Sequence, residues 1–178
     1  MKKNLIKFLI LTSFMFSGCS LDLKTKDLAK AGLQEHSITL IDHYFDLNYV
    51  ENPAIAFGLL LAIPKDIRLP LIFLLTISAT MFGFYMIWKL RQRKFRILLP
   101  FFILIGGAYG NIIDRMLHGF VTDFFHLHYH YQYNFYVFNV ADVLVNVGII
   151  LMLIQWKDFK VIFDDMFNQK PLLKTELE

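Results

Sequence analysis

Four long apolar runs, separated by polar and charged segments, dominate the pattern along the chain. They cover about residues 5–21, 69–88, 97–117 and 136–156. Each run is long enough, as a helix rising ~1.5 Å per residue, to cross the ~30 Å hydrocarbon core of a bilayer. The pattern therefore predicts four transmembrane helices.

Basic residues are distributed unevenly around these runs. No Lys or Arg lies between His118 and Tyr136, whereas the connection between the second and third runs carries Lys89, Arg91, Arg93, Lys94 and Arg96. Cytoplasmic loops are enriched in Lys and Arg, so we expect the basic connection inside the cell and the other outside. Both termini are then cytoplasmic, in agreement with the lysines near the two ends: Lys2, Lys3, Lys7, Lys157, Lys160, Lys170 and Lys174.

The segment between the first two runs, about residues 22–68, is predicted to be external. Residues 37–49 are rich in β-branched and aromatic side chains, which is typical of short strands, and Asn52 followed by Pro53 indicates a turn. We expect a small β-rich platform here. The predicted fold is a membrane all-α protein, a four-transmembrane-helix bundle carrying this external platform, in one domain over residues 1–178.

The composition supports a membrane protein. Hydrophobic residues make up 56% of the chain, above the ~45–50% that is usual for soluble domains. The basic block lies beside two predicted spans, so it indicates membrane topology and not nucleic-acid binding. A single cysteine, Cys19, excludes an internal disulfide and a metal site built from cysteines.

Two of the apolar runs contain polar residues at helical spacing. In each run they fall on one face of the helix: Asn139, Asp142 and Asn146 in the fourth, and Asn111, Asp114, Arg115 and His118 in the third. A charge at mid-bilayer costs at least ~2.5–3.5 kcal/mol, which makes such residues functional candidates. Hydrogen bonding between helices is the alternative, and it suits Asn146. For Asp114, a local ion pair with Arg115 or a helix cap is the alternative to catalysis.

Asp123 and Asp142 are the strongest candidates for chemistry. Asp123 follows the outer end of the third run, and Asp142 lies one to two turns into the fourth, which returns from the same side. Two carboxylates that converge there can share one proton, so that one accepts a proton from water while the other polarises a carbonyl. The sequence thus predicts an aspartic peptidase acting at the membrane.

A second hypothesis rests on the external histidines. His126, His128 and His130 alternate along a segment that, as a strand, would place all three on one face. Imidazoles so arranged are plausible ligands for Zn²⁺ or Cu²⁺. A small membrane transporter or metal-binding protein that uses this cluster is therefore the alternative function, although the intervening aromatic residues equally fit a strand lying on the membrane surface.

A third hypothesis concerns the N-terminus. Lysines, an apolar stretch and then Phe16-Ser17-Gly18-Cys19 are typical of a lipoprotein signal peptide that is cleaved before the cysteine. The alternative is a first span that is retained. Three later spans favour retention, because a processed lipoprotein does not require them.

Four blocks of the chain, in order, resemble bacterial lipoprotein signal peptidase, the signal peptidase II family of aspartic peptidases. Asp22–Lys26 (DLKTK) is similar to the family's Asp-x-x-[Ser/Thr]-Lys motif, and Asn52–Gly58 (NPAIAFG) to its Asn-x-Gly-Ala-Ala-Phe segment. Residues 110–123 (GNIIDRMLHGFVTD) and 138–142 (FNVAD) resemble its two later blocks. Ala54 stands where the family has glycine.

The resemblance implies removal of the signal peptide from diacylglyceryl-modified prolipoproteins, with cleavage on the amino side of the lipidated cysteine. It implies Asp123 and Asp142 as the catalytic pair, with Asn52, Asn111, Arg115 and Asn139 around the substrate and Asp22 and Lys26 in a retained first helix. Asp114 lies in the same central block. Expected partners are the prolipoprotein and membrane lipids, with no nucleic acid, no cofactor and no metal. The expected location is the bacterial inner membrane, as a monomer with several spans.

Overall fold

The structure, a computed structural model, describes residues 2–54, 60–130 and 132–168. Residues 55–58 of the Asn52–Gly58 block, and Lys170 and Lys174 of the tail, lie outside the described residues. The elements in chain order are α1 (Lys2–Gly32), β1 (Ile38–Ile41), β2 (Phe45–Asn52), α2 (Lys65–Lys89), α3 (Phe95–His118), β3 (Val121–Tyr129), β4 (Tyr133–Asn134), α4 (Val140–Ile154) and α5 (Trp156–Asn168).

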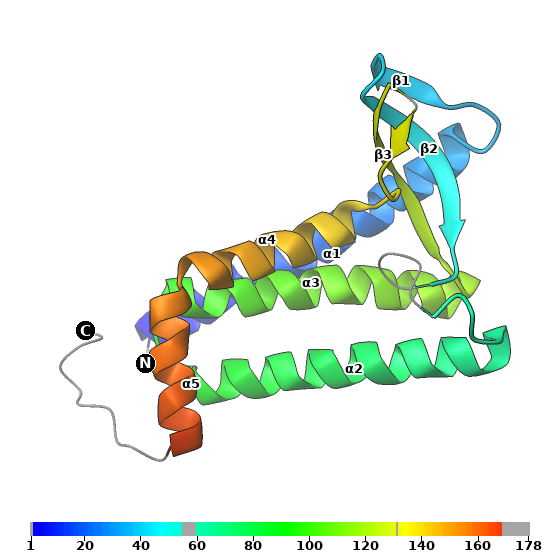
Figure 1. The fold of residues 1–178 in the computed structure, drawn as a ribbon. Helices are drawn as coiled ribbons and strands as arrows, with labels where there is room; N and C mark the ends of the chain where they lie inside the picture. The colour runs from blue at the N-terminus through cyan, green and yellow to red at the C-terminus, as the bar shows by residue number, and fades with distance from the viewer. Residues whose placement is uncertain (1, 55–59, 131, 169–178) are drawn as a thin grey trace.

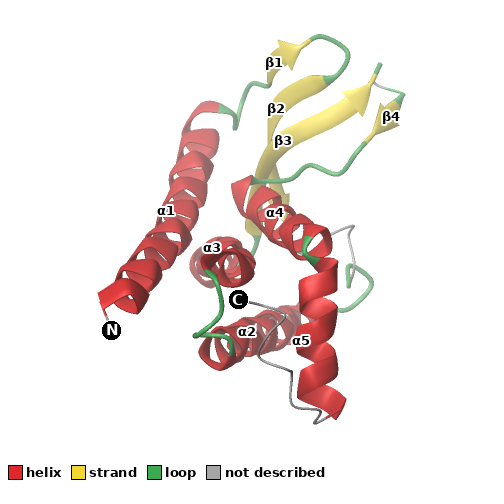
Figure 2. Ribbon diagram, turned by 90° about the vertical axis from the view of Figure 1, so that its left-hand side faces the viewer, coloured by secondary structure: helices red, strands yellow, loops and turns green. Residues whose placement is uncertain are grey.

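Helix α3 is the centre of the bundle and packs against α1, α2 and α4 (Figures 1 and 2). Its buried apolar side chains form the largest core cluster together with residues of α1, α2 and α5, among them Leu11, Met86, Leu98, Phe101 and Phe159. Small residues allow the close approach of neighbouring backbones. A Cβ on Gly107 would lie 2.6 Å from the carbonyl oxygen of Ala141, so α3 and α4 can pack at this distance only with glycine there.

The membrane-spanning prediction is confirmed for α1, α2 and α3, each long and apolar enough to cross a bilayer. A fourth span is counted only if α4 and α5, which bend by 79° at their junction, are taken together. Helix α1 and the pair of α4 and α5 do not coincide with the first and fourth apolar runs, residues 5–21 and 136–156. Helix α1 continues to Gly32 because Asp22 and Lys26 pair with each other one turn apart and do not end the helix. Helix α4 begins only at Val140, where Asn139 caps it.

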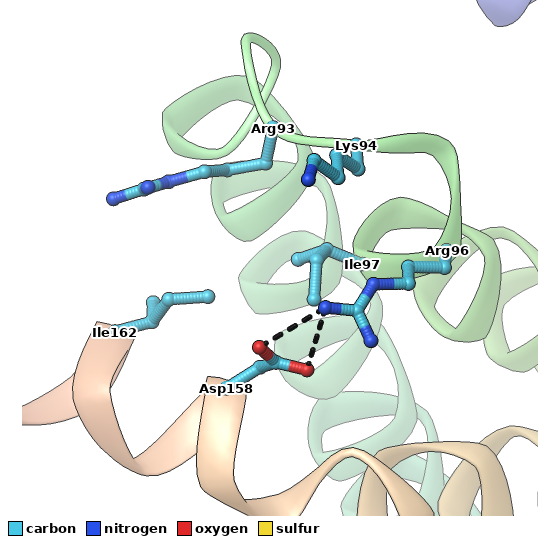
Figure 3. A pocket seen from close by; sticks show the side chains of 6 residues that line it. All are labelled: Arg93, Lys94, Arg96, Ile97, Asp158 and Ile162. Atoms are coloured by element: carbon cyan, nitrogen blue, oxygen red, sulfur yellow. Dashed lines mark hydrogen bonds and ion pairs between the residues drawn. The ribbon is translucent and has the colours of Figure 1, made fainter. Parts of the chain in front are cut away.

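Helix α5 crosses the bundle at the end far from the sheet (Figure 1). Arg96, in the first turn of α3, contacts both carboxylate oxygens of Asp158 on α5 at 3.1 and 3.2 Å (Figure 3). At this same end Lys7 of α1 donates hydrogen bonds to the carbonyl oxygens of Arg91 and Arg93. The start of α1, the basic connection and α5 therefore lie together.

A four-stranded antiparallel sheet, in the order β1-β2-β3-β4, stands at the other end of the bundle. Strands β1 and β2 confirm the strands predicted within residues 37–49. The central strand β3 comes from the connection between α3 and α4, and pairs with β2 over registers such as Asp46↔His126 and Val50↔Asp123. The two segments that were predicted to be external thus build one platform, and the all-α class is not confirmed.

Candidate active site

Asp142 is held at the start of α4 by a reciprocal capping box. The Asn139 side-chain oxygen accepts a hydrogen bond from the Asp142 backbone N–H at 2.9 Å, and an Asp142 carboxylate oxygen accepts one from the Asn139 backbone N–H at 3.2 Å. A carboxylate in the first helical turn is also stabilised by the helix dipole. Helix capping therefore fixes the position of this carboxylate.

Asp123 lies on β3 and is linked to Asp142 through Asn139. The Asn139 amide group donates to one oxygen of Asp123 at 2.6 Å, and Asn52, at the end of β2, donates to the other at 2.8 Å. Asp123 is 1% exposed. The pairing of β2 with β3 and the cap of α4 thus bring two sequence-distant carboxylates to the same asparagine.

Burial and a neighbouring charge change the acidity of Asp123. Burial raises the pKa of its carboxyl group from 3.8 to about 7, and repulsion from Asp142 acts in the same direction. Hydrogen bonds from Asn52 and Asn139, and the positive charge of Lys26, oppose that rise in pKa. A carboxyl group with such a pKa can hold a proton near neutral pH, which is what an aspartic pair needs from one of its members.

Asn111 orients the other side of Asp142. Its amide group donates to Asp142 at 3.0 Å, while its oxygen accepts from Lys26 at 2.8 Å and from Asn139 at 3.2 Å. With a cation on its oxygen, the amide of Asn111 can turn only its N–H groups toward the carboxylate. Lys26 therefore acts on Asp142 through Asn111.

Lys26 and Asp22 form a buried ion pair beneath the site. Their atoms lie 2.7 Å apart, with side chains 3% and 0% exposed. The second oxygen of Asp22 accepts a hydrogen bond at 2.7 Å from the Ala141 backbone N–H, in the first turn of α4. Gly110 of α3 packs directly on this carboxylate, and a Cβ there would collide with it. The pair thus joins α1, α3 and α4 at one point.

Asp114 and Arg115 do not form the local ion pair that was one interpretation of their adjacency. Asp114 instead lies 2.8 Å from His118, accepts from the Thr122 backbone N–H at 2.7 Å, and approaches Lys26 at 3.5 Å. The bond to Thr122 ties the end of α3 to β3, but it is not a helix cap, because the unpaired groups at the C-terminal end of a helix are carbonyl oxygens, which need donors. Adjacent helix positions point about 100° apart, and Arg115 donates to the Ala54 carbonyl oxygen at 2.7 Å.

A pocket of about 540 Å³ opens beside Asp123. Its walls come from the end of β2, from Leu61, from β3 and from the segment before α4, and are largely apolar: Val50, Glu51, Asn52, Pro53, Leu61, Asp123, His126, Asn134, Phe135, Tyr136 and Val137. The pocket gives an extended ligand access to one member of the carboxylate pair.

All nine site residues predicted from the sequence lie in or against one hydrogen-bonded network, whereas the three histidines separate. His126 and His128 share a face of β3, but the expectation for His130 is wrong. Strand β3 ends at Tyr129, His130 adopts a left-handed conformation with φ 50°, and its ring stacks on His43. Two contacts were missed. Ala54 lies in the Asn52–Gly58 block, but it contributes its backbone carbonyl oxygen, which a sequence motif does not reveal, and Asp46, whose carboxylate contacts His128, belongs to none of the four blocks.

Comparisons with known proteins find matches over most of the chain. Residues 14–157 match the family described as Signal peptidase (SPase) II. The chain is 38% identical over 139 residues to a lipoprotein signal peptidase of Clostridium tetani, covering 77% of this chain and 85% of the relative. It is 36% identical over 160 residues to a lipoprotein signal peptidase of Syntrophotalea carbinolica, covering 87% and 96%.

Solved structures support the fold. A bacterial membrane enzyme determined by the in meso method at 2.3 Å resolution has a TM-score of 0.68 at 24% identity, covering 96% of this chain and 93% of that one. A second, at 1.9 Å resolution, has a TM-score of 0.66 at 25% identity, covering 83% and 90%. The arrangement of helices and sheet is therefore one seen in membrane enzymes.

Proposed function

Because this chain belongs to the signal peptidase II family, we propose that Asp123 and Asp142 are its catalytic pair. The protein is a multi-pass membrane aspartic peptidase that removes signal peptides from prolipoproteins. The observation that carries the assignment is the position of Asn139, which donates from its backbone to Asp142 and from its side chain to Asp123.

In the proposed mechanism the pair begins the reaction with one proton. Asp142, the less buried carboxylate, takes a proton from a water molecule as the water oxygen attacks the scissile carbonyl carbon. Asp123, protonated at a pKa of about 7, donates a hydrogen bond to the carbonyl oxygen and stabilises the charge that develops there. The departing amine receives a proton from the pair as the C–N bond breaks, which restores the single shared proton.

The charge balance of the network supports this single proton. Two cations, Lys26 and Arg115, face four carboxylates, namely Asp22, Asp114, Asp123 and Asp142. With every carboxylate ionised the buried network would carry two uncompensated negative charges, and burial makes such a state costly. One retained proton reduces the number of uncompensated negative charges from two to one.

We propose the pocket beside Asp123 as the place where the substrate meets the pair. The substrate is expected to be a prolipoprotein with a diacylglyceryl-modified cysteine, cut on the amino side of that cysteine. A lipid attached next to the cleaved bond keeps the substrate at the membrane, and the apolar residues Leu61, Phe135 and Val137 give the pocket walls that suit an apolar ligand. Asn52 and Arg115 are expected to support the substrate from the end of the platform.

The proposed location is the bacterial inner membrane, with the platform outside and both termini in the cytoplasm. The basic connection, the start of α1 and α5 share the end of the bundle opposite the sheet, as the positive-inside rule expects. We expect a monomeric single domain with α1 retained, because cleavage before Cys19 would remove the buried core residues Leu11 and Met15. The transporter alternative is not favoured by the family match.

A cleavage assay with two substrates tests the proposed specificity. Purified protein is incubated with one prolipoprotein in diacylglyceryl-modified and unmodified forms, and mass spectrometry locates the cut. We expect cleavage of the modified form only, immediately before the modified cysteine. Equal cleavage of both forms, or a cut elsewhere in the signal peptide, would contradict the proposed substrate while leaving the peptidase activity intact.

A further inference from the structure

Apart from the catalytic network, one group of metal-ligating side chains among the described residues converges on the platform. His126 and His128 are two residues apart on β3 and project from the same face, and Asp46 on β2 is the register partner of His126. One imidazole nitrogen of each histidine and one carboxylate oxygen of Asp46 lie within 4.8 Å of one another. Neither the proposed mechanism nor the network around Lys26 uses these three residues.

We propose that Asp46, His126 and His128 bind one divalent transition-metal ion such as Zn²⁺. Neutral imidazole nitrogens and a carboxylate oxygen are a normal ligand set for this class of ion. Bonds of ~2.0–2.1 Å place the ligands of a tetrahedral ion about 3.4 Å apart, so only small side-chain rotations separate the present arrangement from a bound one. Asp46 and His128 are already 3.0 Å apart, with His128 0% exposed and Asp46 9% exposed at the side chain.

The surroundings of Asp46 favour a cation. Residues 31–64 and 116–156, which include the whole sheet, contain no Lys or Arg, so the platform supplies no permanently charged side chain to balance this buried carboxylate. The Oδ1 atom of Asp46 and the Oδ1 atom of the neighbouring Asn48 are both buried, and neither accepts a hydrogen bond within the described residues. Buried acceptors without donors are unfavourable, and a metal ion in the cluster would compensate the charge.

Asn48 and the pocket complete the case for a binding site. The Asn48 amide nitrogen lies 3.0 Å from Nδ1 of His126, an interaction that orients the ring as partners outside the ligand set of a metal commonly do. His126 is only partly buried and lines the 540 Å³ pocket, which gives an ion a path from solvent. A bound ion would therefore lie at the wall of the pocket that Asp123 also lines.

The test measures metal binding by the full-length protein, purified in detergent without a polyhistidine tag. After incubation with Zn²⁺ and removal of free metal, we expect about one Zn²⁺ per chain in the wild type, as for a single site. His126→Ala and His128→Ala each remove a ligand and should weaken Zn²⁺ binding tenfold or more, at least as much as the roughly 10–100-fold loss seen when a partner outside the ligand set is removed. His130→Ala and His43→Ala, which remove the stacked pair nearby, are matched controls and should bind as the wild type does.

Two further measurements keep the result interpretable. Thermal unfolding in the presence of a chelator identifies any variant that is misfolded. A misfolded histidine variant is replaced by Asn48→Ala, which leaves the three ligands unchanged. We expect Asn48→Ala to bind Zn²⁺ more weakly than wild type does. Co²⁺ substitution should give the strong visible absorption of a low-coordinate site in wild type and His130→Ala, but not in folded His126→Ala. Absence of Zn²⁺ binding by wild type, or equal binding by wild type, His126→Ala and His128→Ala, would overturn the proposal.

Discussion

Asn139 and Asp142 hold each other at the start of α4, each side chain accepting a hydrogen bond from the other's backbone N–H, at 2.9 and 3.2 Å. The amide group of Asn139 remains free to donate to Asp123. One asparagine therefore caps the helix and also connects the two carboxylates. These two tasks can be separated by substitution.

Replacing Asn139 tests this double role. Asn139→Ala removes the cap and the bond to Asp123, so we expect a loss of ~1 kcal/mol in the free energy of unfolding together with lower activity. Asn139→Ser retains a capping hydroxyl but has no amide to reach Asp123. Asn139→Ser should recover most of the stability, but its kcat should stay tenfold or more below that of wild type. A tenfold lower kcat corresponds to a loss of about 1.4 kcal/mol of transition-state stabilisation. Asn146→Ala, about two turns further along the chain, is the control, and full activity in Asn139→Ser would contradict the role.

The pH dependence of cleavage should follow Asp123. Its pKa is raised from 3.8 to about 7, so the proton that the mechanism requires is present below about pH 7 and is lost as the pH rises above it. We expect kcat to fall tenfold per pH unit on the alkaline side. Asn52→Ala removes a hydrogen bond that stabilises the ionised form, and should move this alkaline limb to higher pH. A limb that moves to lower pH would contradict the assignment.

The buried pair of Lys26 and Asp22 should contribute to stability through charge balance. Lys26→Met leaves Asp22 and Asp114, which are 0% and 3% exposed, without their cation, so we expect a loss of ~3–5 kcal/mol in the free energy of unfolding. Asp22→Asn in the same chain should restore part of this stability. Lys24→Met, at an exposed position on the same helix, should change stability by less than ~0.5 kcal/mol. Thermal unfolding in detergent of wild type, Lys26→Met, Asp22→Asn and the double variant measures the coupling, and strict additivity would refute it.

Gly110 should tolerate no larger side chain. A Cβ at this position would collide with the Asp22 carboxylate, so Gly110→Ala must displace α1 or α3 and should cost ~1–3 kcal/mol in the free energy of unfolding, with reduced cleavage. Gly32→Ala, where a Cβ would meet no atom within 4 Å, is the matched control. The same assay on both variants decides the point, and equal stability of the two would show that the contact is not restrictive.

The sequence predicted the features of the fold and the site that depend on a single helix. Apolar length indicates α2 and α3 almost to their ends, because the thickness of a bilayer dictates the length of a spanning helix. Charged and amide side chains in apolar surroundings pointed to Asp142 and Asn111, since lipid makes such residues costly. The resemblance to a family added Asp22, Lys26 and Asn52, which the helix pattern alone did not distinguish.

What depends on contacts between distant segments could not be predicted. Strands β2 and β3 pair residues that lie 69 to 82 positions apart in the sequence, and short strands become recognisable mainly through that pairing. The fourth apolar run ends close to the bend of 79° after Ile154, but hydropathy does not show that the chain continues beyond it as a helix in a new direction. His130 departs from the strand because β3 ends one residue earlier, and strand ends are set by pairing with β2 and β4 rather than by alternation.

The central claim is that Asp123 and Asp142 act together on the scissile bond. It is tested most directly by a gel-shift assay of a diacylglyceryl-modified prolipoprotein with wild type, Asp123→Asn, Asp142→Asn and the exposed-site control Asp27→Asn, all verified as folded by thermal unfolding. We predict cleavage by wild type and Asp27→Asn, and none by either of the other two variants. Near-wild-type cleavage by folded Asp123→Asn or Asp142→Asn would contradict the account.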